Sequence, residues 1–248
     1  MTVNGDKIRP FRHLKPAMLP PEVKKKFKTE WQPIMRKMEN TPDLVIPRDA
    51  TKIDSIVIET TFVSGLDIRD FENAIKSNTK LIYLESPSSA IFSLQDIKAV
   101  TTLAKTKGIK TIIDNTWATP IFQKPLTMGV DLEVHSCSKY LGGHSDIIGG
   151  VVIGKETDIK SIFHNEYELL GAKTAPMEAW LLLRSLRTLT VRLKQHQEST
   201  MKVVSFLEIH SKISKVNYPG LKSHSQYDLA KKQMQGFTGL LSFKLNTE

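Results

Sequence analysis

Four residues between positions 114 and 139 are of types that together could hold an aromatic aldehyde cofactor. Asp114 follows one short apolar run, and Lys139 follows the next, together with Ser136 and Ser138. A carboxylate can keep a pyridine nitrogen protonated, and a lysine amine in a desolvated pocket can form an imine with an aldehyde. The two serines lie two positions apart, so in an extended segment both hydroxyls point to one side, where they could bind a phosphate.

The same residues also allow ordinary structural roles. Asp114 could cap the loop that begins after it, the serine hydroxyls could satisfy nearby backbone groups, and Lys139 could be a surface cation. Residue types and spacing alone leave both interpretations open.

The elements around these residues predict an α/β fold. Short β-branched runs at 56–63, 81–86, 111–114, 130–136 and 147–154 are typical of strands, and the runs at 111–113 and 130–135 are expected to be buried. Helices are expected at 66–77, capped by Asp67, and from the segment 93–96 to about 107, ended by Gly108. This alternation predicts a mostly parallel sheet with helices on both faces, and in such sheets ligands bind at the strand ends.

The carboxyl-terminal part differs in pattern. One long helix is expected from 176 to about 210, with Trp180, Leu183, Leu186 and Leu193 as its buried stripe. Its arginines Arg184, Arg187 and Arg192 are expected on the solvated side. A turn at 216–221 and a strand within 236–245 follow, so residues 215–248 are predicted to begin a small α+β domain that is too short to close its own core.

Composition narrows the class of protein. The chain has 248 residues, a formal net charge of +9 and one cysteine, which is compatible with a reducing cytosol and excludes an internal disulfide framework. No apolar run approaches the roughly 20 residues of a membrane span. The lysines are spread along many segments, so the charge favours phosphate-bearing small molecules over nucleic acid.

Residues 1–57 form a basic, proline-rich extension. One helix is plausible at 21–39, where apolar residues recur every three or four positions: Phe27, Trp31, Ile34 and Met38. The neighbouring lysines Lys24, Lys25, Lys26 and Lys28 would also suit a nucleic-acid-binding arm, but a packing appendage is favoured.

Three segments carry a resemblance to a known family: LIYLESPSS (81–89), IIDNTWATPIF (112–122) and SCSKYLGGHSDIIGG (136–150). In their residues and in their spacing they resemble the transsulfuration enzymes of cysteine and methionine metabolism. These enzymes depend on pyridoxal 5'-phosphate (PLP) and include cystathionine β-lyases, γ-lyases and γ-synthases and methionine γ-lyases. The resemblance begins at about Ile58. It implies a partial fold type I large domain at 58–214.

The resemblance also implies roles for individual residues. Lys139 corresponds to the lysine that bonds to the cofactor aldehyde and moves the substrate proton, and Asp114 to the partner of the pyridinium nitrogen. The remaining implied cofactor contacts are Ser136 and Ser138 for the phosphate, Ser89 for the ring hydroxyl and Thr116 beside the ring.

The chain also departs from the family. No small-residue phosphate loop, ring-stacking tyrosine or Tyr-x-Arg arm occurs in residues 1–57, and the arginine that binds the substrate carboxylate would lie beyond residue 248. The expected protein is therefore a cytoplasmic, homo-oligomeric lyase or synthase of reduced activity that acts on cystathionine-like amino acids. Two alternatives stay open: a degenerate, non-catalytic homologue that serves as a binding or interaction module, and a module associated with nucleic acid.

Overall fold

The computed structural model describes residues 2–3, 6–7, 59–171 and 173–246. The chain divides into two compact units, residues 1–62 and 63–248. In the first unit, strand β1 (Thr2–Val3) pairs antiparallel with β2 (Asp6–Lys7). The helix predicted at 21–39 and the start of the strand predicted at 56–63 lie outside the described residues, and residues 59–63 are not in a strand.

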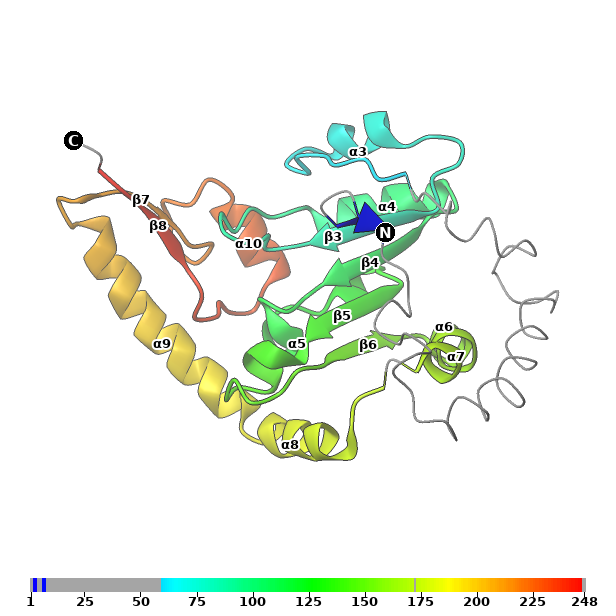
Figure 1. Ribbon diagram of the computed structural model, residues 1–248. Coiled ribbons are helices and arrows are strands. Elements are labelled where there is room, and N and C mark those ends of the chain that lie inside the picture. The colour runs from blue at the N-terminus through cyan, green and yellow to red at the C-terminus, as the bar shows by residue number, and fades with distance from the viewer. Residues whose placement is uncertain (1, 4–5, 8–58, 172, 247–248) are drawn as a thin grey trace. The chain divides into compact units, whose positions relative to one another are not determined.

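A four-stranded sheet forms the centre of the second unit (Figure 1). Its strands follow the order β3 (Leu81–Glu85), β4 (Lys110–Asp114), β5 (Leu132–Ser136) and β6 (Gly150–Gly154). The first three are parallel, and β6 runs antiparallel to β5. The register pairs Glu85 with Asp114 and Asp114 with Val134, so the carboxyl ends of the parallel strands meet at one edge of the sheet.

Helices α3 (Ile68–Ala74) and α4 (Ile97–Thr106) pack against one face of this sheet. Both begin where a carboxylate can accept backbone N–H groups. Asp67 caps α3 and Asp96 caps α4, and Gly108 follows α4 with φ +66°. The core between them consists of aliphatic and aromatic side chains, including Phe71, Ile82, Leu84, Ile97, Val100 and Ile113. The elements predicted in this part of the chain are confirmed.

The other face of the sheet differs from the prediction of helices on both faces. Leu81, Tyr83 and Val152 point to this face and are 48%, 57% and 42% exposed. Helix α6 (Glu156–Ile162) reaches it at Gly154, where a Cβ would lie 3.7 Å from Ile159. The strands have the composition of a doubly buried sheet, but the described residues leave much of this face open.

Two helices replace the single long helix predicted from residue 176. Helix α8 (Pro176–Leu186) ends at Arg187, and α9 (Leu189–Glu208) begins after Thr188. The Thr188 hydroxyl and amide both donate to the carbonyl of Ser185, at 3.1 and 3.0 Å, and this local bonding competes with helix continuation.

The predicted buried stripe is therefore mostly wrong. Leu193 is fully buried, whereas Trp180, Leu183 and Leu186 are exposed. Two further short helices lie earlier in the chain: α5 (Thr119–Phe122) follows β4, and α7 (Glu168–Leu170) precedes α8.

The last described segments form a small antiparallel pair and one helix. Strand β7 (Ile213–Asn217) pairs with β8 (Ser242–Leu245), and α10 (Tyr227–Gln233) lies between them in sequence. The predicted turn at 216–221 is partly wrong, since Val216 and Asn217 belong to β7. A second core joins this region to the loops after β3 and β4 through Phe92, Leu94, Trp117, Tyr218 and Met234. The boundary at 214/215 stays a prediction.

Candidate active site

A cavity of about 460 Å³ lies at the carboxyl ends of the parallel strands. All six site residues predicted from the sequence line it: Ser89, Asp114, Thr116, Ser136, Ser138 and Lys139. Strand ends of an α/β sheet are where polar side chains from several segments can converge on one ligand. The structure therefore places the acid and the amine in the same cavity.

Asp114 is held by the loop that begins with it. Its Oδ1 accepts the backbone N–H of Thr116 at 2.8 Å, and Thr116 Oγ1 accepts the backbone N–H of Ser136 at 2.8 Å. These two bonds connect the end of β4 to the end of β5. They fix Asp114 and Ser136 relative to each other without using the Asp114 Oδ2 atom.

Lys139 lies on a tight turn, Cys137–Leu141, that interrupts regular backbone with φ −102° and ψ −130° at Lys139 itself. The Gly143 N–H donates to the Lys139 carbonyl at 2.7 Å, and the Cys137 N–H donates to the Gly149 carbonyl at 2.8 Å. The turn is thus closed at both ends by backbone bonds. The Lys139 side chain is exposed, so the cavity in this chain does not desolvate the amine as the sequence interpretation assumed.

Arg192 supports this turn from α9. Its Nη1 donates to the Tyr140 carbonyl at 2.8 Å, and its Nη2 donates to Ser185 Oγ at 2.9 Å. A Cβ on Gly143, where φ is +76°, would lie 2.3 Å from Arg192 Nη1. The expectation that Arg192 covers a solvated helix face is therefore wrong, because its guanidinium occupies the space that Gly143 leaves free.

A buried polar network lies next to these residues and was not predicted. Glu133 Oε1 accepts from Asn115 Nδ2 at 2.7 Å and pairs with His135 Nε2 at 2.7 Å. Gln123 Nε2 donates to Asn115 Oδ1 at 3.0 Å and to the Ser86 carbonyl at 2.7 Å. The network therefore links the ends of β3, β4 and β5, from which the cavity residues project.

Two further cavity residues, Trp117 and Tyr140, contact distant parts of the chain. The Tyr140 hydroxyl accepts the Gly239 N–H at 2.8 Å, and its ring meets His196 edge to face with centroids 5.3 Å apart. Trp117 Nε1 donates to the Leu240 carbonyl at 3.1 Å. Burial raises the pKa of Tyr140, so this hydroxyl stays protonated at neutral pH. The sequence offers no local signal for these contacts because the partners lie about 100 residues apart.

The acidic side of the cavity holds two carboxylates. Ser89 donates its hydroxyl to Glu85 Oε1, and Glu85 is paired in register with Asp114. Burial raises the pKa of Tyr83, and the charges of Asp114 and Glu85 add to that effect. Glu85 was not among the predicted site residues, yet it accepts the hydrogen bond of the hydroxyl that the resemblance assigns to the cofactor ring.

The donor set of the cavity fits PLP at the ring and the aldehyde. It provides a carboxylate for the pyridinium nitrogen, a primary amine, and free serine hydroxyls. Among the described residues there is no group of three or more side chains that could hold a metal ion, and no helix long and apolar enough to cross a bilayer.

Comparison with known proteins decides the family. The model of the Cys/Met metabolism PLP-dependent enzymes matches residues 50–248. The chain belongs to this family. It is 39% identical over 202 residues to cystathionine gamma-lyase of Bacillus subtilis, covering 81% of this chain and 53% of that protein. It is 40% identical over 193 residues to cystathionine beta-lyase of Lactococcus lactis, covering 78% and 50%.

A solved structure gives the same result for the fold. Cystathionine gamma-lyase from Lactobacillus plantarum, solved in complex with L-serine, superposes with a TM-score of 0.75 at 39% identity, over 79% of this chain and 52% of that one. The resemblance read from the three motifs and the α/β fold are confirmed. The chain spans about half the length of the curated relatives it matches.

Proposed function

We propose that this chain forms the PLP-binding part of a carbon–sulfur lyase or synthase acting on cystathionine-like amino acids by β- or γ-elimination or replacement. The observation that carries the proposal is that Asp114 and Lys139 line one cavity together with the serine hydroxyls. The family and the names of the relatives support the reaction class. We further propose cytoplasmic location and a homo-oligomer.

When bound, PLP supplies an aldehyde that takes up amines and an aromatic ring that accepts electrons from the adjacent carbon. In the proposed site, Asp114 would accept a hydrogen bond from the ring nitrogen and keep it charged. Ser136 and Ser138 would donate to the phosphate. The Lys139 amine would face the aldehyde end and would move a proton at the substrate Cα.

The backbone around Lys139 is fixed close to the proposed position of the reacting atoms. Its turn is fixed by backbone bonds and by Arg192, while its amine faces the cavity that holds Asp114. Few cationic side chains of the cavity could bind the cofactor phosphate, because Lys139 would be occupied by the aldehyde. We therefore propose weak cofactor affinity and reduced turnover for this chain alone.

The test is an absorbance titration with PLP, followed by borohydride reduction and mapping of the labelled peptide. Lys139→Ala is the test variant, and Lys98→Ala, which removes an exposed lysine on α4, is the matched control. Labelling at Lys139 that only Lys139→Ala removes, with slow release of product from cystathionine, supports the proposal.

Two other outcomes are informative. Labelling at Lys139 without any turnover would favour the binding-module alternative, and labelling spread over surface lysines in both variants would overturn the proposal. Salt-sensitive retention on a polyanion matrix would instead support the nucleic-acid alternative.

A further inference from the structure

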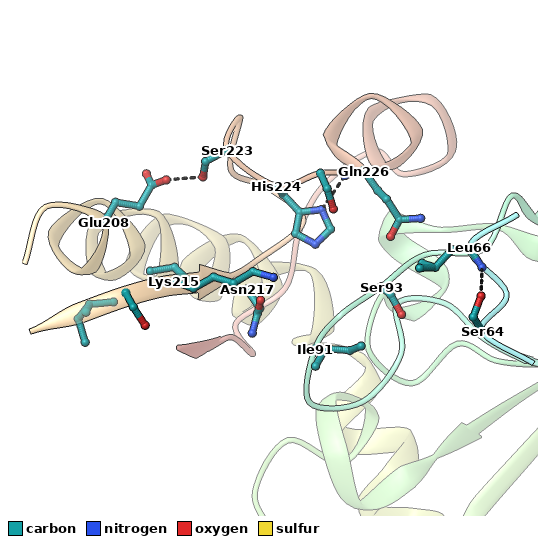
Figure 2. Close-up of a pocket in the computed structure, with 14 residues that line it drawn as sticks. Ser64, Leu66, Ile91, Ser93, Glu208, Lys215, Asn217, Ser223, His224 and Gln226 are labelled. Atoms are coloured by element: carbon teal, nitrogen blue, oxygen red, sulfur yellow. Dashed lines mark hydrogen bonds between the residues drawn. The ribbon is translucent and has the colours of Figure 1, made fainter. Parts of the chain in front are cut away.

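A second cavity, of about 610 Å³, lies in the same unit and shares no lining residue with the candidate active site. It is formed by strand β7, residues 223–226, the end of α9 and the loops that precede α3 and α4 (Figure 2). Its volume is in the range of small-molecule sites. Five serines, two amides and three charged or titratable side chains contribute to its wall.

Two side chains that carry nitrogen donors, one lysine and one histidine, line this cavity. Lys215 projects from β7, and the ring of His224 points into the same hollow, as Figure 2 shows. Burial lowers the pKa of His224, and the charge of Lys215 lowers it further. Among the described residues, no ion pair joins Lys215 to a carboxylate. The Lys215 ammonium therefore favours the neutral form of His224 when no anion lies between the two groups.

The hydrogen bonds of His224 orient its ring for donation. Its Nδ1 accepts the backbone N–H of Gln226 at 3.2 Å, which leaves the proton of the neutral ring on Nε2. The Nε2–H is then available to a ligand. Both Lys215 and His224 thus present donors, whichever protonation state His224 adopts.

Most other polar groups of the wall are already engaged. Gln226 exchanges two hydrogen bonds with the backbone of Leu94, at 2.8 and 2.7 Å, and Ser214 donates to the Lys244 carbonyl at 3.0 Å. Glu208, the acidic member of the wall, accepts a hydrogen bond from Ser223 through Oε1. The groups best placed to receive a ligand are therefore the Lys215 ammonium and the His224 Nε2–H.

We propose that Lys215 and His224 form a binding site for an oxyanion, the carboxylate or phosphate group of a small metabolite. The anion would lie between the ammonium and Nε2–H groups and accept a hydrogen bond from each. The exposed side chains of Ile91 and Leu66 would contact the apolar remainder of the ligand. Nothing in this site depends on PLP.

The experiment follows the His224 ring signals by NMR in the full chain without PLP, during titration with inorganic phosphate in one arm and acetate in the other. His224→Gln identifies the signal. Saturable shifts and a higher His224 pKa in the presence of the anion are expected. Lys215→Gln should weaken binding at least about 10-fold, since a charge-assisted hydrogen bond is lost.

The matched control is Lys222→Gln, which removes an exposed lysine near the cavity that does not line it and should leave the affinity unchanged. Circular dichroism checks that each variant is folded. A response to phosphate alone would assign the site to phosphate esters, and a response to both probes would assign it to carboxylates as well. Shifts that never saturate, or that Lys215→Gln leaves intact, would overturn the proposal.

Discussion

Asn115 and Glu133 are joined by a hydrogen bond of 2.7 Å between two side chains that are 1% and 3% exposed. Asn115 follows Asp114 directly, and Glu133 lies three residues before Ser136. A carboxylate is costly to bury, and this one is bonded through Oε1 to Asn115 and His135. The bond therefore makes the geometry of the acid-bearing loop depend on the interior of the sheet.

Asn115→Ala should destabilise the protein by about 3 kcal/mol, because it removes one of two hydrogen bonds from the buried Glu133 carboxylate and one of two from the Gln123 amide. Urea unfolding followed by tryptophan fluorescence measures the change. Thr127→Ala, which removes an exposed hydroxyl bonded to the Lys124 carbonyl, is the control and should change stability by less than about 0.5 kcal/mol. Equal effects in the two variants would contradict the buried network.

Asp131 should contribute stability that depends on pH. Burial acts to raise its pKa, but hydrogen bonds from the Thr111 amide and hydroxyl, with Lys110 nearby, lower it overall. A folded-state pKa below the unfolded value of about 3.9 stabilises the protein above that pH, and this contribution is lost as pH falls through the folded pKa.

The measurement is the free energy of unfolding of the wild type and Asp131→Asn at several pH values. The difference should be largest above about pH 5 and should shrink below about pH 4. Thr111→Val keeps the backbone donor but removes the hydroxyl, so it should show part of the effect. A difference that stays constant from pH 3 to 7 would rule out the proposed linkage.

Two leucines of the predicted helix stripe should behave in opposite ways. Leu193→Ala removes a fully buried side chain and should cost about 2–5 kcal/mol, whereas Leu183→Ala changes an exposed one and should cost less than about 0.5 kcal/mol. Thermal or urea unfolding distinguishes them. A large loss in Leu183→Ala would mean that this side chain is covered in solution.

Tyr140→Phe should weaken the link between the Lys139 turn and the carboxyl-terminal segment. The variant loses the acceptor for the Gly239 amide, and because this bond is part-buried its loss should cost about 1 kcal/mol. We also expect weaker PLP binding, because Tyr140 lines the cavity. Tyr227→Phe is the control, since the Tyr227 hydroxyl has no hydrogen bond to the described residues. Unchanged stability and cofactor affinity in Tyr140→Phe would contradict this role.

The sequence predicted those features that short-range chemistry determines. The caps at Asp67 and Asp96, the turn at Gly108 and the strands that lead to Asp114 and Ser136 each follow from a few neighbouring residues. Because the strand ends are parallel and adjacent, the six predicted site residues had to converge. Their roles toward PLP remain predictions.

Features that depend on tertiary contacts could not be predicted from sequence patterns. The break at Thr188 depends on a side chain that competes with the helix, and the helix period alone cannot reveal it. Arg192 was assigned to the surface because its type is usually solvated, yet its guanidinium packs beneath Gly143. Glu133 and His135 have the composition of an exposed strand face, yet both are buried, with Glu133 Oε1 bonded to His135 Nε2 and to Asn115 Nδ2.

The antiparallel return of β6 has a consequence for how the lysine loop forms. The parallel strands β3, β4 and β5 can pair only after long crossover segments have closed, whereas β5 and β6 pair through the residues that carry Lys139. Contacts that are local in sequence form fast and require little loop-closure entropy. The hairpin around Lys139 should therefore be assembled early during folding, before the crossovers bring Asp114 opposite it.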